Sequence, residues 1–325
     1  MRVFLTGGTG FVGSYVADQL VAKGHDVVAL VRETSDTAHL MELGVELVVG
    51  ALGAAEDFGV ALEEAQAVIH VAGMTTARDR RRLYDVNVVG TRDLVDRCAE
   101  RLPSGARFIY ISSVSAQGPS KGRGPRARDK KPRPVSAYGD TKLEGEGAVL
   151  AHRDHLAVTI LRPPPVYGPR DRDMYEVFRL ANRRITPILG GPRRWLSVIH
   201  GEDLGRAVVA CLQAPGQGEI YPVDDGHVYT WEDLVGAIAD GVGKRALKPR
   251  LPKAVFACAA AISEVGGGVL NMTATFTQDK YVEMIQESWV CGNEAICADL
   301  GWSPRWNLAD GARQTAQWYR AQGWL

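Results

Sequence analysis

The chain has 325 residues, of which 46% are hydrophobic and 23% are charged, and these values are ordinary for a soluble globular protein. Its 38 Lys and Arg balance its 38 Asp and Glu, so the formal net charge is zero and gives no electrostatic reason to expect nucleic acid or a membrane as a partner. The length exceeds that of most single cores and predicts two domains, or one domain with a large elaboration.

Cysteine usage and the amino terminus favour a cytoplasmic location. The cysteines are scattered and form no C-x-x-C pair, which indicates reduced thiols and neither a disulfide framework nor a zinc site. The histidines are also dispersed, so we expect no metal. Met1 leads directly into a strand, which leaves no room for a signal peptide. The most apolar stretch, residues 254–262, is too short to span a bilayer.

The first half of the chain alternates between short β-branched runs and helix-like stretches. The runs are apolar at every position, which is typical of strands buried on both faces. Their alternation with helices predicts an α/β fold with a doubly wound parallel sheet of the Rossmann type. The predicted strands are residues 2–5, 27–31, 45–49, 67–71, 108–111 and 158–161, and the main helices are 12–23, 86–101 and 137–152.

Beyond residue 165 the strand signals become sparse. The last convincing strands are 198–199 and 220–223, and the helical patterns are 202–212, 231–242, 253–265, 293–300 and 308–320. We therefore predict a dinucleotide-binding domain at residues 1–165, completed by roughly 198–225. A smaller, mainly helical substrate lobe would comprise residues 166–197 and 226–325. The basic, proline-rich stretch 121–134 is expected to be an exposed loop.

The segment TGGTGFVG follows the first strand and opens the first helix. Gly7, Gly10 and Gly13 allow a tight turn and a close approach to a pyrophosphate, and the helix start, with Phe11 and Val12, supplies free N–H groups. Strand, loop and helix in this order predict a dinucleotide site. An ordinary glycine turn is the alternative reading.

The end of the second strand bears on which dinucleotide binds. An NAD site usually places an acid there, where it accepts from the ribose 2′-hydroxyl. Here the strand ends at Val31-Arg32, and the forked donors of an arginine favour a 2′-phosphate. We therefore predict NADP as the cofactor, with NAD as the alternative if Arg32 only covers the adenine or points into water.

Tyr138 and Lys142 are four residues apart, which places them on one face of a helix. A neighbouring ammonium stabilises a phenolate and lowers the pKa of a tyrosine. Upstream, a predicted strand ends in Ser112-Ser113, where a hydroxyl could donate to a carbonyl or alkoxide oxygen of a substrate. We favour Ser113 as the active serine, whereas Ser112 would be an ordinary cap.

Together, these motifs resemble those of the extended short-chain dehydrogenase/reductase family, of the NAD-dependent epimerase/dehydratase type. They span nearly the whole chain in the family's order. The matching segments are TGGTGFVGS, HVAG (70–73), DVNVVGT (85–91), YISSVS (110–115), the Tyr138 and Lys142 pair, LRPPPVYGP (161–169), VIHGEDLGRA (198–207) and DLGWSP (299–304).

The resemblance implies catalytic roles. Tyr138 would be the general acid/base, Lys142 would lower its pKa and hold the nicotinamide ribose, and Ser113 would bind the reacting oxygen. Asn87 would lie beside the site in a structural role.

The resemblance also implies cofactor contacts. Val71, Ala72 and Gly73 would line the cofactor, and Pro164 and Val166 would approach the nicotinamide through main-chain atoms. The chain departs from the family after the third strand, where Gly-Asp is usual and Leu52 follows Gly50-Ala51. The acid that commonly contacts adenine is therefore missing, which leaves Leu52 as the expected contact.

Several features bear on the branch of the family. Residues 162–165 lack the asparagine common in sugar-nucleotide enzymes, and Arg32 favours NADP. The stretch 251–272 is apolar, and it resembles the steroid-dehydrogenase-like, dihydroflavonol-reductase-like and hopanoid-associated members. It would wall an apolar substrate pocket, or else be a packed core or dimer helix.

We therefore predict an NADP-dependent oxidoreductase that interconverts a secondary alcohol and a ketone on a fairly apolar molecule. A nucleotide-sugar epimerase or dehydratase with tightly bound NAD is the alternative, in which Arg193 and Arg194 would hold a diphosphate. A non-enzymatic sensor of the NADP redox state is a third reading, against which Tyr138 and Lys142 are both present. The family's usual homodimer would form through helices 86–101 and 137–152.

Overall fold

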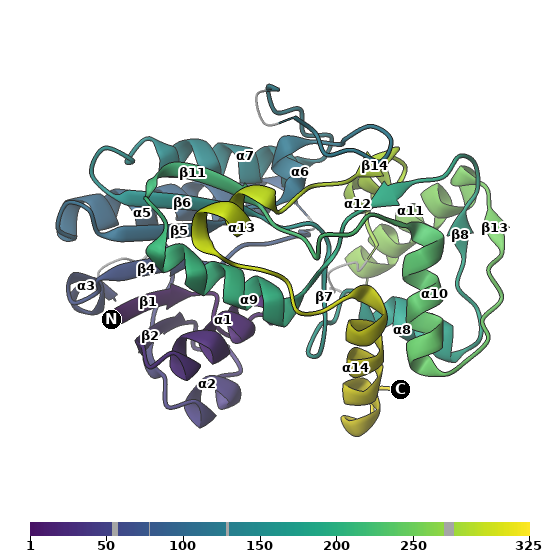
Figure 1. Cartoon of the computed structure of the whole chain (residues 1–325), viewed down its shortest axis with the longest axis horizontal. Coiled ribbons are helices and arrows are strands. Elements are labelled where there is room, and N and C mark those ends of the chain that lie inside the picture. The colour runs from purple at the N-terminus through teal and green to yellow at the C-terminus, as the bar shows by residue number, and fades with distance from the viewer. Residues whose placement is uncertain (54–57, 78, 128–129, 270–275) are drawn as a thin grey trace.

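The computed structural model describes residues 1–53, 58–77, 79–127, 130–269 and 276–325. Its centre is a seven-stranded sheet in the order β11-β6-β5-β4-β1-β2-β3, in which every neighbouring pair is parallel (Figure 1). This confirms the predicted Rossmann-like α/β fold. The strands are β1 (Arg2–Thr6), β2 (Asp26–Val31), β3 (Glu46–Val49), β4 (Ala67–His70), β5 (Arg107–Ile111), β6 (Ala157–Arg162) and β11 (Gln217–Pro222).

The apolar strands are buried on both faces, as the sequence indicates. In β1, Val3 and Leu5 belong to one hydrophobic cluster and Phe4 belongs to another, because successive side chains point to opposite faces. The first cluster includes side chains of α1 (Phe11–Ala22), α2 (Ala38–Glu42) and α9 (Gly201–Ala210). The second includes side chains of α3 (Gly59–Glu63), α5 (Gly90–Arg101) and α7 (Ala137–Leu150). The sheet therefore lies between two layers of helices.

The second lobe gathers around a third cluster. It is formed mainly by side chains of α8 (Tyr175–Asn182), α10 (Trp231–Val242) and α14 (Leu308–Ala321). The start of α10 is determined locally, because Thr230 and Asp233 form a reciprocal capping box. Gly243 ends α10 with a φ of 67°. Three further helices lie between α10 and α14 in the sequence: the long α11 (Lys253–Val269) and the short α12 (Gln278–Met284) and α13 (Glu294–Leu300).

Some elements differ from the expectations. The stretch 86–101 begins with a π-helical turn, Asp85–Val89, before α5. Strands also continue beyond residue 223, contrary to expectation, because two-residue strands are too short to show any periodicity. The short elements that sequence analysis did not anticipate are α4 (Arg80–Tyr84), α6 (Val114–Gln117), β7 (Val166–Tyr167), β8 (Ile188–Leu189), β9 (Trp195–Leu196), β12 (Tyr229–Thr230), β13 (Arg250–Leu251) and β14 (Ser288–Trp289), besides α2, α3, α8 and α12.

Helices α1 and α9 pack closely enough to require a glycine. A Cβ on Gly205 of α9 would lie 2.8 Å from the carbonyl oxygen of Tyr15 in α1. We expect Gly205→Ala to lower the free energy of unfolding by about 1–3 kcal/mol, because backbone has to move to admit the methyl group. Urea unfolding followed by circular dichroism would measure this change.

Gly147→Ala is the matched control. Gly147 is an exposed glycine of α7 with open space around its missing Cβ. Alanine favours a helix over glycine, so this variant should be neutral or more stable by up to about 1 kcal/mol. Equal losses in both variants would contradict the packing argument.

Candidate active site

One cavity of about 1710 Å³ runs along the carboxyl ends of the sheet strands and into the second lobe. In open α/β sheets this edge is where ligands bind. The structure brings every residue predicted for catalysis or for cofactor binding to the lining of this cavity, although they come from segments more than 150 residues apart. They are Gly7, Gly10, Phe11, Val12, Gly13, Arg32, Leu52, Val71, Ala72, Gly73, Ser113, Tyr138, Lys142, Pro164 and Val166.

The glycine loop is held by close backbone contacts. Gly7 has a φ of 74°, and a Cβ there would lie 2.6 Å from the nitrogen of Ala72. A Cβ on Gly13 would lie 2.0 Å from the oxygen of Gly7. These two glycines are therefore required by the chain's own packing, in addition to any clearance for a ligand. Gly10 begins α1 with no side-chain cap, so the loop presents a bare helix N-terminus that fits a pyrophosphate.

Arg32 lies at the end of the cavity formed by the loops after β2 and β3. Ser35, Leu40 and Leu52 line the same end. The backbone nitrogen of Arg32 donates to the hydroxyl of Ser35 at 3.2 Å, which fixes the turn that carries both side chains. No ion pair involves the exposed Arg32 guanidinium within the described part of the chain. Its donors are thus available to an anion.

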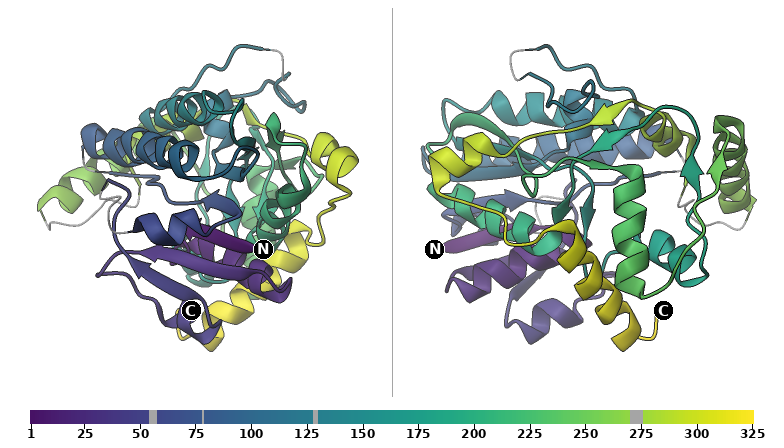
Figure 2. Two further views of the ribbon diagram at one scale, coloured as in Figure 1. Left: turned by 90° about the vertical axis from the view of Figure 1, so that its left-hand side faces the viewer. Right: turned by 45° about the vertical axis from the view of Figure 1, so that its right-hand side comes forward.

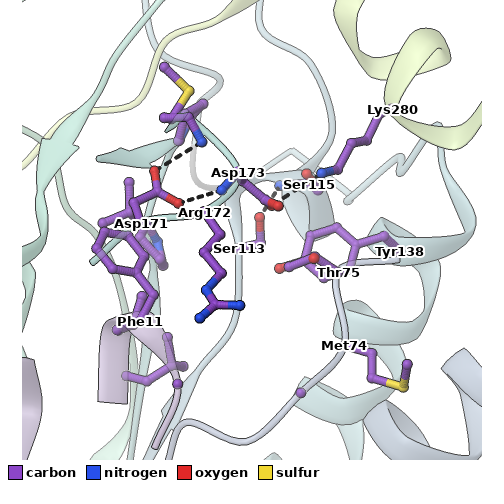
Figure 3. Close-up of a pocket in the computed structure, with 18 of the residues that line it drawn as sticks. Phe11, Met74, Thr75, Ser113, Ser115, Tyr138, Asp171, Arg172, Asp173 and Lys280 are labelled. Atoms are coloured by element: carbon purple, nitrogen blue, oxygen red, sulfur yellow. Dashed lines mark hydrogen bonds and ion pairs between the residues drawn. The ribbon is translucent and has the colours of Figure 1, made fainter. Parts of the chain in front are cut away.

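Tyr138 and Ser113 both project into the same cavity, where Figure 3 shows them near each other. Ser113 follows β5 and caps α6, where its hydroxyl oxygen accepts from the nitrogen of Ser115 at 3.1 Å. Burial is the main influence on Tyr138 and raises the pKa of its hydroxyl, and a hydrogen bond with Ser113 acts in the opposite direction. The raised pKa differs from the lowering that a neighbouring ammonium would cause. Tyr138 therefore holds its proton at neutral pH in this structure.

Lys142 lies one turn further along α7 and is buried. Its ammonium donates to the carbonyl oxygen of Ile111 at 2.6 Å and stands 4.6 Å from the ring centre of Tyr110. Burial lowers the pKa of Lys142 to about 8, while the Glu146 carboxylate acts to raise it. An ammonium held at the end of β5 and beside Gly73 can donate to a ribose hydroxyl in the cavity.

Ser112 and Ser113 have different hydrogen-bond partners. The Ser112 hydroxyl donates to Glu146 at 2.5 Å, and Glu146 is paired with the guanidinium of Arg162 in a buried cluster. Ser112 is therefore committed to the protein interior, which supports Ser113 as the serine that serves a substrate.

Asn87 occupies the π-helical turn before α5. Its side-chain oxygen accepts from the nitrogen of Met74 at 2.8 Å, and its side-chain nitrogen donates to the oxygen of Met74 at 2.9 Å. It also donates to Thr141 of α7 at 3.1 Å. Asn87 thus ties the loop after β4 to the helix that carries Tyr138, which is a structural role.

Helix α12 provides a contact that the sequence did not reveal. The two carboxylate oxygens of Asp279 accept from the backbone nitrogens of Ala137 and Tyr138, each at 3.0 Å. Glu283, one turn later, accepts from the hydroxyl of Ser136 at 2.6 Å. Two acids of the second lobe therefore satisfy the N-terminus of α7, where negative charge is favourable. No local pattern around residue 279 indicates this long-range contact.

Charged residues of the segment after β7 also line the cavity. The ammonium of Lys280 pairs with Asp173 at 3.1 Å, and the exposed guanidinium of Arg172 extends into the pocket from the wall opposite Tyr138 (Figure 3). Burial raises the pKa of Asp171 to about 7, although its oxygens accept from the nitrogens of Asp173 and Met174. These residues could not be singled out from the sequence, because the loop fits no catalytic motif.

The far end of the cavity is mainly apolar. It is lined by side chains of α8, α10, α11 and α12 and of the loops between them, and the charged members of this lining are Glu176, Arg194, Glu232, Asp279, Lys280 and Glu283. Among the apolar members are Val177, Leu180, Ile188, Leu189, Leu234, Val235, Phe256, Ala259, Phe276, Met284 and Trp289. Such a wall suits an apolar substrate.

Within the described residues, no group of His, Cys, Asp and Glu is arranged to hold a metal ion. Within them, no helix combines the length and the apolar character needed to cross a membrane.

The fold and the site define a nucleotide-dependent enzyme of the short-chain dehydrogenase/reductase kind. The model of the NAD dependent epimerase/dehydratase family matches residues 3–223, and the chain belongs to this family. The resemblance found in the sequence motifs is thereby confirmed. The family and its relatives are NAD(P)-dependent oxidoreductases and epimerases of the extended type.

Three relatives span most of this chain. A ceramide reductase of Caulobacter vibrioides is 32% identical over 99% of this chain and 96% of its own. A UDP-glucose 4-epimerase of Vibrio cholerae is 27% identical over 97% and 94%. A decarboxylating sterol-4-alpha-carboxylate 3-dehydrogenase of Dictyostelium discoideum is 26% identical over 69% and 71%. Among solved structures, gox2253 has a TM-score of 0.83 and 25% identity, covering 100% of this chain and 99% of that chain.

The contact between α12 and α7 generates a prediction. We expect Asp279→Asn to lower the free energy of unfolding by about 1–2 kcal/mol, because an amide offers one acceptor where the carboxylate offers two and a charge. Turnover should fall as well, because the backbone of Tyr138 loses its anchor. Chemical denaturation and steady-state kinetics would measure the two effects.

Asp154→Asn, an exposed acid beyond the other end of α7, is the control and should change neither quantity. An Asp279→Asn variant as stable as the unaltered protein would show that this contact contributes nothing to the start of α7.

Proposed function

We propose that the protein is an NADP-dependent reductase that converts a ketone on an apolar molecule to a secondary alcohol. The observation that carries this proposal is the meeting of Ser113 and Tyr138 between a bare glycine loop and an apolar pocket. The raised pKa keeps on Tyr138 the proton that reduction consumes, and the reverse reaction would use the same groups in the opposite direction.

The residues that line the cavity include groups suited to each part of a dinucleotide. Gly7, Gly10 and the start of α1 would hold the pyrophosphate, and Arg32 with Ser35 would bind a 2′-phosphate. Lys142 would donate to the nicotinamide ribose from its position at the end of β5. The bound cofactor supplies the hydride.

The chain's own groups supply the proton and the polarisation. Ser113 would donate to the carbonyl oxygen of the substrate, and Tyr138 would transfer its hydroxyl proton to that oxygen as negative charge develops there. The pKa of Lys142, lowered to about 8 by burial, still leaves this side chain mostly charged at neutral pH. Its ammonium would stabilise the phenolate that remains on Tyr138.

Apolar substrates are supported by two observations. The far end of the cavity is lined mainly by aliphatic and aromatic side chains. The relatives include proteins named for ceramide and for a sterol carboxylate. We infer a lipid-like ketone as the substrate class.

A nucleotide-sugar epimerase is the second candidate, favoured by the Vibrio cholerae relative and by Arg172 in the cavity. Arg193 and Arg194, which were expected to hold a diphosphate, offer less support for an epimerase. Arg194 lines the cavity but donates to the carbonyl oxygens of Leu189 and Pro192, at 3.3 and 3.2 Å. Arg193 is exposed and does not line the cavity.

The reaction itself is tested with purified protein and two kinds of substrate. We expect consumption of NADPH with long-chain ketones and no interconversion of UDP-glucose and UDP-galactose. Tyr138→Phe should lower kcat by about 10²–10⁴-fold, because the proton donor is lost, and leave NADPH binding within a few-fold. Absorbance at the NADPH band measures turnover. Retained turnover in the variant would show that another group carries the proton, and epimerisation without net NADPH use would favour the second candidate.

The choice of cofactor is tested at Arg32. We expect Arg32→Asp to lower the preference for NADPH over NADH by about tenfold or more, because the carboxylate repels a 2′-phosphate and accepts from a 2′-hydroxyl. Titrations with both nucleotides give the ratio of dissociation constants. Arg80→Asp, at an exposed arginine of α4 that does not line the cavity, is the control for a change of net charge. An unchanged ratio in Arg32→Asp would remove the argument for NADP.

A further inference from the structure

Residues 244–265 leave several large apolar side chains in water. The exposed fractions are 75% for Leu247, 72% for Ile262, 67% for Val265 and 45% for Val255. The last three lie on α11, which stands at the outer edge of the second lobe, away from the sheet (Figure 2, right). Exposed apolar residues gathered in one segment, unlike scattered ones, indicate an interaction surface.

The same segment is strongly basic. Residues 244–265 contain five cations, Lys244, Arg245, Lys248, Arg250 and Lys253, and one acid, Glu264, whose carboxylate accepts from the nitrogen of Gln278. Arg250 is paired with Glu232 at 3.2 Å, and the ion pairs of the described chain include none of the other four. The zero net charge of the protein therefore hides a local excess of positive charge.

Helix α11 also borders the substrate cavity. Phe256 and Ala259 line the cavity, whereas Val255, Ile262 and Val265 are exposed to solvent. One helix thus lies between the apolar interior of the cavity and an apolar outer surface. A molecule that dissolves in lipid would meet apolar groups on both sides of α11.

We propose that residues 244–265 dock the protein on the surface of an anionic lipid bilayer, and that apolar substrate enters the cavity past α11. Lysine and arginine near an anionic leaflet are attracted by its charge, while neighbouring aliphatic side chains enter the acyl boundary. Bilayer binding stands independently of the reaction, whereas substrate entry rests on the proposed function.

A bilayer fits this surface better than a second copy of the chain does. A twofold contact through residues 244–265 would bring the same cations of two chains together. The exposed side chains of α11 are mostly alanine and aliphatic, without the aromatic anchors that dominate protein interfaces.

The test uses the full chain and sedimentation with vesicles. We expect binding to vesicles of phosphatidylcholine and phosphatidylglycerol in a ratio of about 7 to 3, weakened by high salt, and little binding to pure phosphatidylcholine. Ile262→Ser with Val265→Ser should lower the partition coefficient about tenfold or more, because two apolar side chains no longer enter the lipid. Lys248→Glu with Lys253→Glu should lower it at least as much.

Lys130→Glu with Lys131→Glu is the matched control, because it reverses two charges in the other basic stretch and should leave binding unchanged. None of the altered residues lines the cavity, so turnover of a water-soluble ketone should also stay unchanged in every variant. Turnover of a ketone embedded in vesicles should fall in the two docking variants alone.

Three results would overturn the proposal: equal binding of all variants, loss of binding only in the Lys130 and Lys131 control, or conversion of a dimer to a monomer by the Ile262 and Val265 changes. The last is read by light scattering and would assign the surface to a second copy. Vesicle binding without any ketone reduction would instead retain the docking surface and reject the proposed function.

Discussion

The parallel pairing of apolar strands is the constraint on which the rest of this structure depends. Strands such as β1 bury side chains on both faces, so helices must cover each face, and each connection must cross the sheet. The carboxyl ends of all strands consequently meet at one edge. The glycine loop after β1, Arg32 after β2 and Ser113 after β5 reach the same cavity for this reason, although they are far apart in the sequence.

The second lobe does more than cover this edge. Asp279 and Glu283 of α12 bind the N-terminus of α7, and Lys280 of the same helix pairs with Asp173 across the pocket. The helix that carries Tyr138 is therefore anchored from both sides, by Asn87 of the sheet domain and by acids of the lobe. Helix α12, whose residues line the pocket, is thereby joined through its acids to the start of the helix that carries Tyr138.

The local distribution of charge in this protein is more informative than its net charge. The overall balance of acids and bases gives no reason to expect a membrane, yet residues 244–265 hold five cations and one acid. Burial likewise changes the pKa values of single ionisable groups. It lowers the pKa of Lys142 to about 8 and raises that of Tyr138, so the pair behaves differently from two solvated side chains at the same spacing.

The sequence by itself determined the sheet, the glycine loop and the family, because buried strands, helix starts and the glycine spacing are local patterns. It also placed Tyr138 and Lys142 on one helical face. Only the tertiary structure revealed the partner of Ser112, since Glu146 comes from α7 and is itself paired with Arg162 of β6. The contacts of Asp279, the position of Arg172 in the cavity and the short strands of the second lobe also could not be read from the sequence, because long-range contacts and two-residue strands leave no periodic signal.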